Sequence, residues 1–298
     1  MAADAVGVKR VGVLGSGLMG SGIGQASAAA GYPTVVRDVV PAALERGRAA
    51  IASSLTKLSE KGKLPPAGRD AALARLTFTT DLAALADCDL VIEAVTEDLE
   101  LKRALLAELD PRCPPATIFA SNTSSLTIGA LAAGTSRPDR FLGLHFFNPV
   151  PIMPLVEVVR AITTSAETFE RGMAFVRSLG KEPVAARDTS GFLVNLLLVP
   201  YLLDAVRALE RRVGSVADLD LAMRLGAGHP MGPFTLLDFV GIDTTVRIAE
   251  IMFDEYRETR YAAPPLLRRM ALAGLHGRKT GRGFYDYTSD PPVPVPFD

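Results

Sequence analysis

Short apolar runs alternate with helical patterns along the first half of the chain. The runs at 10–14, 34–38, 76–80, 89–95, 117–122 and 140–147 are rich in β-branched and aromatic residues, which is typical of strands. Strands separated by helices predict an α/β fold of the Rossmann type, with a mainly parallel sheet covered on both faces. Ligands of such sheets bind at the carboxyl ends of the strands, so candidate residues are sought just after each run.

The second half has a different pattern. From residue 191 onward the apolar positions follow helical spacing, and helices are predicted over 191–212, 215–226, 235–256 and 264–274. We therefore expect a nucleotide-binding domain over 1–187 and an all-α C-terminal domain over 188–298. Within the first domain, 41–75 predicts a pair of helices that projects as an arm between two strands. The proline-rich end, 290–298, predicts a loose tail.

A glycine-rich turn follows the first predicted strand and opens a helix of small residues. In the pattern GxGxxG, the first glycine allows a tight turn, the second lets backbone amides approach a pyrophosphate, and the third lets the helix pack closely. Asp38 closes the second strand about 20 residues later, which completes a dinucleotide fingerprint. Asp38 favours NAD over NADP, although Arg37 beside it weakens that preference. The residues assigned to the turn are Gly15, Gly17, Leu18, Met19 and Gly20.

The stretch "FLGLHFFNPVPIMPLVEVV" carries a titratable pair, His145 and Glu157, inside an apolar segment. Prolines interrupt the chain between them, so the two residues belong to separate strands and can face each other if those strands pair. A carboxylate beside an imidazole fixes its tautomer and stabilises the imidazolium. Burying such a pair seldom stabilises a protein, which favours a catalytic dyad over a core histidine satisfied by an acid.

Two hydroxyl residues, Ser124 and Ser125, precede an apolar helical stretch. We expect one of them to be the N-cap of that helix, which leaves the other for substrate.

Composition narrows the classes of function. The net charge is −1 and the isoelectric point about 6.3, so no overall field attracts nucleic acid or an anionic membrane. The most apolar stretch, 192–206, is interrupted by polar residues and is too short to span a bilayer. Two cysteines favour a reducing compartment, and the start has no signal-peptide pattern. We expect a cytoplasmic protein, and no histidine or cysteine spacing predicts a metal site.

Seven motifs together resemble a known family over nearly the whole chain. They are "GSGLMGSGI", "EAVTEDLELK", "ASNTSSLTI", the histidine stretch quoted above, "DTSGFLVNLLL", "HPMGPFTLLDFVGIDT" and "GRKTGRGFYDY". The chain resembles the short-form 3-hydroxyacyl-CoA dehydrogenases, most of all the 3-hydroxybutyryl-CoA dehydrogenases of bacteria. The resemblance implies hydride transfer between NAD and a 3-hydroxyacyl thioester of coenzyme A, with a short acyl chain, and a homodimer formed through the C-terminal helical domain.

The same resemblance implies roles for individual residues. His145 is expected to be the general base and Glu157 its orienting partner. Ser54 and Lys61 are expected to contact coenzyme A, although their spacing alone fits an ordinary solvated helix. The remaining implied positions are Ser124 and Asn195 at the substrate, and Glu97, Lys102, Asn148 and Lys279 near the cofactor.

Two other functions stay open on the sequence. An NAD-dependent dehydrogenase of a free hydroxy acid or sugar acid, such as gulonate, could share the fold and the dyad. A non-catalytic protein that binds NAD or acyl-CoA belongs to another class and has no need of the dyad.

Overall fold

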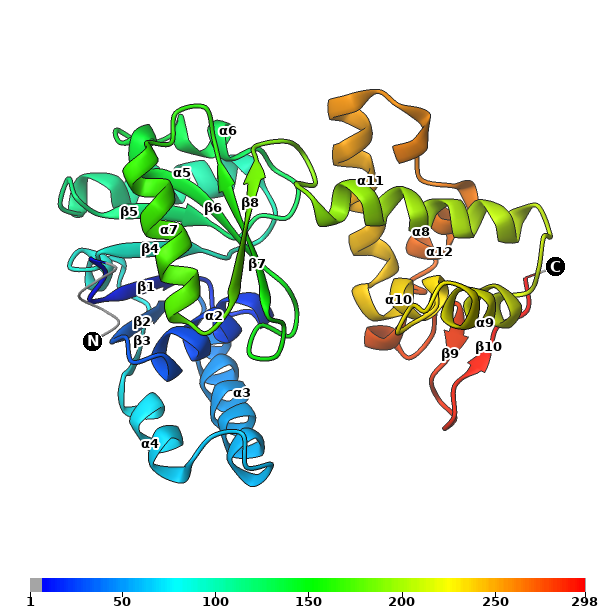
Figure 1. Cartoon of the computed structure of the whole chain (residues 1–298), viewed down its shortest axis with the longest axis horizontal. Helices are drawn as coiled ribbons and strands as arrows, with labels where there is room; N and C mark the ends of the chain where they lie inside the picture. The colour runs from blue at the N-terminus through cyan, green and yellow to red at the C-terminus, as the bar shows by residue number, and fades with distance from the viewer. Residues whose placement is uncertain (1–6, 298) are drawn as a thin grey trace. The chain divides into compact units, whose positions relative to one another are not determined.

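The strands of the first half form one sheet, whose order places the candidate residues. The computed structural model describes residues 7–297 (Figure 1). The chain divides into two compact units, Met1–Phe192 and Leu193–Asp298. The sheet of the first unit has the order β3-β2-β1-β4-β5-β6-β7-β8, and its neighbours are parallel except for the antiparallel pair β6 and β7. The predicted α/β fold is confirmed. The strands are β1 (Val11–Leu14), β2 (Thr34–Arg37), β3 (Leu76–Thr79), β4 (Leu90–Glu93), β5 (Ile118–Ser121), β6 (Phe141–Phe146), β7 (Leu155–Arg160) and β8 (Glu182–Arg187).

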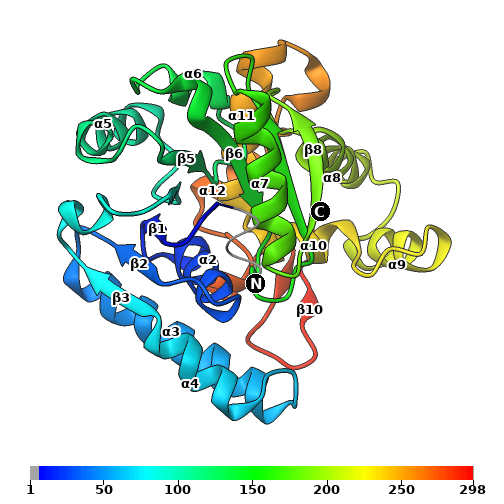
Figure 2. The same cartoon turned by 60° about the vertical axis from the view of Figure 1, so that its left-hand side comes forward.

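Side chains alternate between the two faces of this sheet, so each face builds its own core. In β1, Val11 and Val13 belong to the core that includes Phe175 of α7 (Ala166–Ser178), while Leu14 belongs to the core that includes Leu106 of α5 (Leu99–Leu109). Figure 2 shows α5 and α6 on one side of the sheet and α7 on the other. Burial on both faces explains why these strands read as continuous apolar runs. The covering helices are α2 (Leu18–Ala29), α5 (Leu99–Leu109), α6 (Ile128–Ala132) and α7 (Ala166–Ser178), with the 3₁₀ turns η1 (Leu82–Leu85), η2 (Asp110–Arg112) and η3 (Pro138–Arg140).

A helix pair lies between β2 and β3, as the pattern predicts. It consists of α3 (Pro41–Glu60) and α4 (Pro66–Ala74), and each helix starts with proline, whose fixed φ suits a first turn. Ile51, Leu55 and Ala72 pack with Ala28 of α2, so the pair is anchored on the nucleotide-binding half. Gly47 brings α3 close to the glycine-rich turn, because a Cβ there would lie 2.9 Å from the Ser16 carbonyl oxygen.

The second unit is mainly helical and has its own apolar core, in which Leu203, Phe234 and Phe284 are fully buried. Of the helices in the described part of the chain, none is long and apolar enough to cross a membrane. The elements of this unit are α8 (Val194–Glu210), α9 (Val216–Gly226), α10 (Pro233–Val240), α11 (Ile242–Tyr256), η4 (Thr259–Tyr261), α12 (Pro265–Leu272), η5 (Arg278–Thr280), β9 (Tyr285–Asp286) and β10 (Val293–Pro294).

Two expectations for this unit were wrong. The single helix expected over 235–256 is broken at Gly241, which has a φ of 103°, a backbone conformation that glycine adopts readily. The proline-rich end is also not a loose tail up to residue 297. Val293 and Pro294 pair with the β9 strand, and the Phe297 ring packs 5.5 Å from that of Phe284. Residue 298 lies outside the described residues.

Candidate active site

His145 and Glu157 lie opposite each other on neighbouring antiparallel strands. The register of β6 and β7 pairs the two residues, and the His145 Nδ1 lies 2.6 Å from the Glu157 Oε2. Both residues are buried, with exposed fractions of 6% and 0%. Because Leu144 and Phe146 belong to the core with α7, strand alternation places His145 on the opposite face, towards α6. His145 is the last residue but one of β6, and Glu157 lies opposite it. The pair is thus at the carboxyl end of β6, where parallel sheets bind their ligands.

The surroundings of the imidazole restrict it to one orientation. The ring of Phe147 lies 4.5 Å from that of His145 and the ring of Phe192 lies 5.7 Å away, measured between centroids. A carboxylate only accepts hydrogen bonds, so Nδ1 is the donor to Glu157. In the neutral ring the Nε2 is then the acceptor, and within residues 7–297 it has no hydrogen-bond partner. The arrangement leaves Nε2 able to take a proton from a bound hydroxyl.

Ser124 belongs to a loop after β5 that is organised by Glu97. The Glu97 Oε1 accepts hydrogen bonds from the Ser124 amide at 3.0 Å and from the Ser125 hydroxyl at 3.0 Å, and also from the Thr123 hydroxyl. Burial raises the pKa of Glu97, but the Lys102 ammonium and the bonds from Thr123 and Ser124 outweigh it and hold this pKa below its ordinary value. Glu97 is therefore ionised at neutral pH, and its carboxylate fixes the shape of the loop by accepting these hydrogen bonds.

Lys102 is buried beneath this loop, with 1% of its surface exposed. Its Nζ lies 2.7 Å from Glu93 and 3.2 Å from Glu97, and it also donates to the Val95 carbonyl at 3.2 Å. Glu93 is fully buried and accepts from the Ser121 hydroxyl as well. Three protein acceptors match the three protons of an ammonium group. Lys102 therefore reaches the loop after β5 through its ion pair with Glu97.

The predicted N-cap for α6 was wrong. Neither Ser124 nor Ser125 caps this helix, since the N-cap position is Thr127, which makes no side-chain capping bond. Instead the carboxylate of Asp188 accepts from the amides of Ile128 and Gly129 at 2.6 and 2.7 Å. Asp188 follows β8 and is far away in sequence, so local patterns give no signal for this contact. The serine hydroxyl of Ser125 is used by Glu97 instead.

The glycine-rich turn after β1 has the geometry that a pyrophosphate requires. Gly15 has a φ of 97°, and a Cβ on Gly20 would lie 2.0 Å from the Gly15 carbonyl oxygen, so α2 can approach only without a side chain there. A Cβ on Gly17 would meet nothing within 4 Å, which shows open space over the start of α2. A cavity of about 540 Å³ adjoins the turn and includes Gly15, Gly17, Asp38, Val95 and Leu105 in its wall. It lies between β1 and β4, where the strand order reverses.

Asp38 at the end of β2 is an ionised acceptor in the wall of this cavity. Its carboxylate accepts from the Ser16 amide at 2.8 Å and hydroxyl at 2.9 Å, and from the Val40 amide at 3.1 Å. Burial raises the pKa of Asp38, but these hydrogen bonds lower it by more, so that the pKa lies below its ordinary value. Arg37 directs its Nε to the Thr80 carbonyl at 3.3 Å. The acid and the open turn fit the ribose and pyrophosphate of a dinucleotide.

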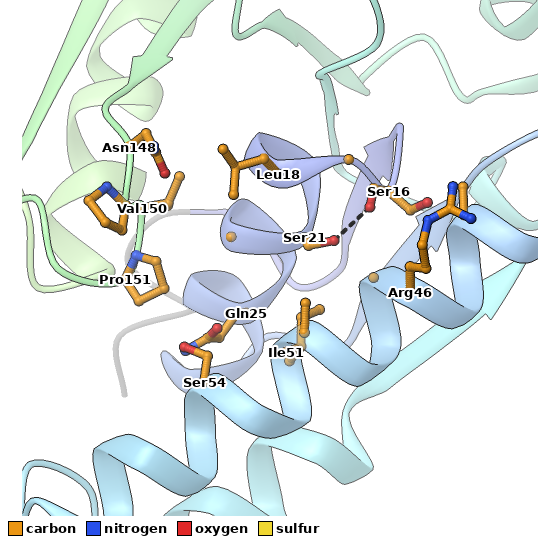
Figure 3. Close-up of a pocket in the computed structure, with 16 residues that line it drawn as sticks. Ser16, Leu18, Ser21, Gln25, Arg46, Ile51, Ser54, Asn148, Val150 and Pro151 are labelled. Carbon is orange, nitrogen blue, oxygen red and sulfur yellow. Dashed lines mark hydrogen bonds between the residues drawn. The ribbon is translucent and has the colours of Figure 1, made fainter. Parts of the chain in front are cut away.

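A second cleft, of about 420 Å³, lies beside the turn on the side of the arm (Figure 3). Its walls come from three elements. Leu18 and Gln25 belong to α2, Ser54 belongs to α3, and Asn148 and Pro151 belong to the loop between β6 and β7. Lys61 follows α3 and is exposed, outside the lining of this cleft.

The remaining predicted residues, Asn195 and Lys279, belong to the second unit. Asn195 lies in the first turn of α8. Lys279 makes an ion pair of 2.6 Å with Asp243 at the start of α11. Burial raises the pKa of Asp243, but its bonds with Lys279 lower it overall. Among the described residues, no group of three or more His, Cys, Asp or Glu side chains is placed to hold a metal ion.

The fold and the site define a dinucleotide-dependent oxidoreductase. The chain belongs to the 3-hydroxyacyl-CoA dehydrogenase family, whose NAD-binding domain matches residues 10–189 and whose C-terminal domain matches residues 191–287. A 3-hydroxybutyryl-CoA dehydrogenase of Mycobacterium tuberculosis is 50% identical over 282 residues, 94% of this chain and 99% of that protein. The human mitochondrial hydroxyacyl-coenzyme A dehydrogenase is 45% identical over 96% of this chain and 93% of its own length. The solved (S)-3-hydroxybutyryl-CoA dehydrogenase of Ralstonia eutropha superimposes with a TM-score of 0.90 at 43% identity, covering 95% of this chain and 100% of that one.

Proposed function

We propose that the protein is an NAD-dependent dehydrogenase that interconverts (S)-3-hydroxyacyl-CoA and 3-oxoacyl-CoA. The observation that carries this function is the buried imidazole of His145, oriented by Glu157 at the carboxyl edge of a sheet that also forms a dinucleotide cavity. The bacterial relatives named above act on 3-hydroxybutyryl-CoA, which supports a short acyl chain here. The reaction is then the exchange of 3-hydroxybutyryl-CoA and acetoacetyl-CoA.

The chain supplies the proton chemistry of this reaction. His145 takes the proton of the C3 hydroxyl at Nε2, and Glu157 stabilises the imidazolium that forms. When bound, NAD supplies the acceptor for the C3 hydride. Ser124, whose amide is fixed by Glu97, binds the C3 oxygen. Asn195 binds the thioester side of the substrate in this proposal. These contacts hold the reacting atoms in line, which is a large part of the rate enhancement of such enzymes.

Cofactor residues are assigned on the same basis. The turn from Gly15 to Gly20 binds the pyrophosphate, and Asn148 and Lys279 contact the cofactor, while Glu97 and Lys102 organise the loop next to it. The ionised carboxylate of Asp38 repels a 2′-phosphate, which supports NAD over NADP. Arg37 is engaged with the Thr80 carbonyl, which further supports this preference.

The arm is assigned to coenzyme A. Ser54 lines the cleft beside the glycine-rich turn, and the exposed Lys61 at the end of the same helix supplies positive charge for a phosphate group. A free hydroxy acid or sugar acid has no group that needs this cleft. The arm therefore favours a thioester of coenzyme A as substrate over a free acid.

We also propose a cytoplasmic homodimer. On α9 the side chains of Leu221 and Leu225 are one helical turn apart and are 49% and 75% exposed, an apolar stripe suited to a subunit contact. Both cysteines, Cys88 and Cys113, are buried free thiols, which supports a reducing compartment such as the cytoplasm.

The test is a spectrophotometric assay at the NADH band. Acetoacetyl-CoA with NADH is expected to be reduced with a far higher kcat/KM than free acetoacetate, and NADH is expected to be used in preference to NADPH. A higher kcat/KM for the free acid would favour a hydroxy-acid dehydrogenase. Tight binding of NADH without turnover of either compound would indicate a non-catalytic binding protein.

A further inference from the structure

Lys181 is a buried cation that the mechanism above does not use. It precedes β8 and is 9% exposed, and its Nζ donates to the Val150 carbonyl at 2.5 Å and to the Met153 carbonyl at 2.7 Å. Within residues 7–297 no carboxylate lies within ion-pair distance of this ammonium. Burying an ammonium without an acid costs free energy, and burial lowers the pKa of Lys181 accordingly. A neutral side chain of the same length would avoid that cost.

Both acceptors belong to one loop, 147–154, which joins β6 to β7. Prolines 149, 151 and 154 give this loop few amide donors, so several of its carbonyl groups need a partner from elsewhere. The amides of Ile152 and Met153 turn back to the Pro149 carbonyl, both at 2.9 Å. The Lys181 ammonium satisfies two further carbonyls, and the next amide, Glu182, donates to the Pro154 carbonyl at 2.8 Å.

The position of this loop decides the shape of the cleft. Residues 148–151 line the cleft next to α2 and the arm, and Figure 3 shows Asn148, Val150 and Pro151 facing the α2 helix. The loop already packs tightly on that helix, since a Cβ on Gly22 would lie 2.7 Å from the Val150 Cβ. A shift of the loop would therefore change the width of the cleft directly.

The catalytic dyad is held by other bonds. His145 and Glu157 are paired in the register of β6 and β7 and by their own side-chain bond of 2.6 Å. Neither contact involves Lys181. Phe147, whose ring packs on His145, stands at the start of the loop, three residues before the first carbonyl that Lys181 binds. Loss of the ammonium is thus expected to move the wall of the cleft around Val150 and Met153 while the proton-transfer groups stay in place.

We propose that Lys181 is a positioning residue for substrate binding: it fixes loop 147–154 so that residues 148–151 form one wall of the acyl-CoA cleft. The identity of the ligand rests on the proposed function. The fixing of the loop by Lys181 does not rest on that function, because it follows from the two hydrogen bonds to the Val150 and Met153 carbonyls.

The experiment compares wild type with Lys181→Met, which keeps the length of the side chain and removes the charge and the hydrogen bonds. We expect the KM for acetoacetyl-CoA to rise by at least about tenfold, in line with the loss of hydrogen bonds from a charged group, while kcat changes little. Hydrogen exchange of the Ile152 and Met153 amides should become faster. Lys181→Gln keeps a hydrogen-bond donor and should give a KM and exchange rates between those of wild type and Lys181→Met. If the methionine variant does not fold, the glutamine variant tests the proposal in its place.

Tyr32→Phe is the matched control. It removes the bond of 2.6 Å between the hydroxyls of Tyr32 and Ser178, near Lys181 at the end of α7, without touching the loop. It should change neither the KM nor the exchange of the loop amides. A fall in kcat at constant KM in the Lys181 variants, or unchanged exchange in the loop, would overturn the proposal. Wild type that fails to reduce acetoacetyl-CoA would refute the function instead, and the exchange measurement would still test Lys181.

Discussion

His145 and Glu157 occupy sheet positions that apolar side chains could fill at lower cost. Replacing a buried polar pair by apolar residues of the same shape is often neutral or stabilising, so the pair is explained better by chemistry than by stability. The imidazole is held on three sides, by Glu157 and by the rings of Phe147 and Phe192, and keeps one nitrogen for a substrate. The geometry at this scale fits the general base proposed for His145.

Glu157→Gln tests the orienting role. The amide keeps the shape of the side chain but can no longer stabilise an imidazolium with a full negative charge. We expect kcat for 3-hydroxybutyryl-CoA oxidation to fall by about tenfold or more, because the general base is worth about 10²–10⁴-fold and part of that depends on its partner. The measurement is steady-state kinetics at saturating NAD. Unchanged kcat would show that Glu157 is only a structural neighbour.

Asp38 makes a prediction about cofactor choice and pH. Because hydrogen bonds from Ser16 and Val40 lower its folded pKa, the ionised form persists above that value and is lost only as the pH falls through it. The preference for NADH over NADPH should therefore be constant between about pH 7 and pH 8, where the 2′-phosphate of NADPH, whose second pKa is near 6, is fully ionised as well. Asp38→Asn should reduce the preference across this range, since Arg37 is then the dominant charge nearby. A preference that declines in wild type within the range would contradict this explanation.

Residues that carry a motif could be predicted from the sequence, whereas their partners from distant segments could not. His145, Glu157 and Asp38 stand out because they are ionisable groups within or at the end of apolar runs. Phe147 and Phe192 gave no such signal, since aromatic residues in an apolar run are typical of a core. Phe147 is a near neighbour of His145 in sequence, whereas the contact of Phe192 with His145 depends on how the chain returns after β8.

At the scale of elements, the apolar, β-branched runs and the glycine-rich turn predicted β1 to β7, whereas β8 was not predicted. The break between α10 and α11 was missed because the apolar spacing continues across Gly241, and only its backbone conformation ends the first helix. The capping of α6 was assigned to the wrong side chain because its true partner is distant in sequence. The nearest hydroxyls are engaged by Glu97, and the cap comes from Asp188 after β8.

The cluster that joins β4, α5 and the loop after β5 can be tested by removing its cation. Lys102→Met leaves the buried Glu93 and the half-buried Glu97 without a counter-charge, so we expect the free energy of unfolding to fall by about 3–5 kcal/mol. Chemical denaturation monitored by circular dichroism measures this change. Lys57→Met, an exposed lysine on α3, is the control and should be close to neutral. Equal stability of the two variants would mean that the cluster is not held by Lys102.

At the scale of the whole molecule, the two-part organisation follows from the change in pattern near residue 191. The parallel sheet of the first unit and the helices of the second have separate cores, and the two family domains match the same two regions. The arm shows what sequence patterns cannot supply, because its helices could be predicted from spacing, whereas the coenzyme A contact proposed for it rests on family resemblance. Its contact with the glycine-rich turn through Gly47 depends on tertiary packing alone.

The proposed homodimer predicts a mass in solution. Sedimentation equilibrium should give about twice 31.6 kDa for wild type. The double variant Leu221→Asp and Leu225→Asp should lower the mass toward that of one chain, because two charges in an apolar subunit contact are costly to bury. Leu272→Asp changes a leucine that is 89% exposed and serves as the control. A wild-type monomer, or a dimer that survives the double variant, would contradict an interface on α9.

The most direct test of the catalytic site is single-turnover reduction of acetoacetyl-CoA by enzyme-bound NADH, followed at the NADH band in wild type and His145→Gln. The variant is expected to transfer hydride at least about 10²-fold more slowly, because no other group replaces the lost acid–base residue. Its affinity for NADH, measured by fluorescence titration, should be little changed, since the cofactor cavity is lined by other residues. A rate close to wild type in a variant that still binds NADH would contradict the assignment of His145 and the mechanism built on it.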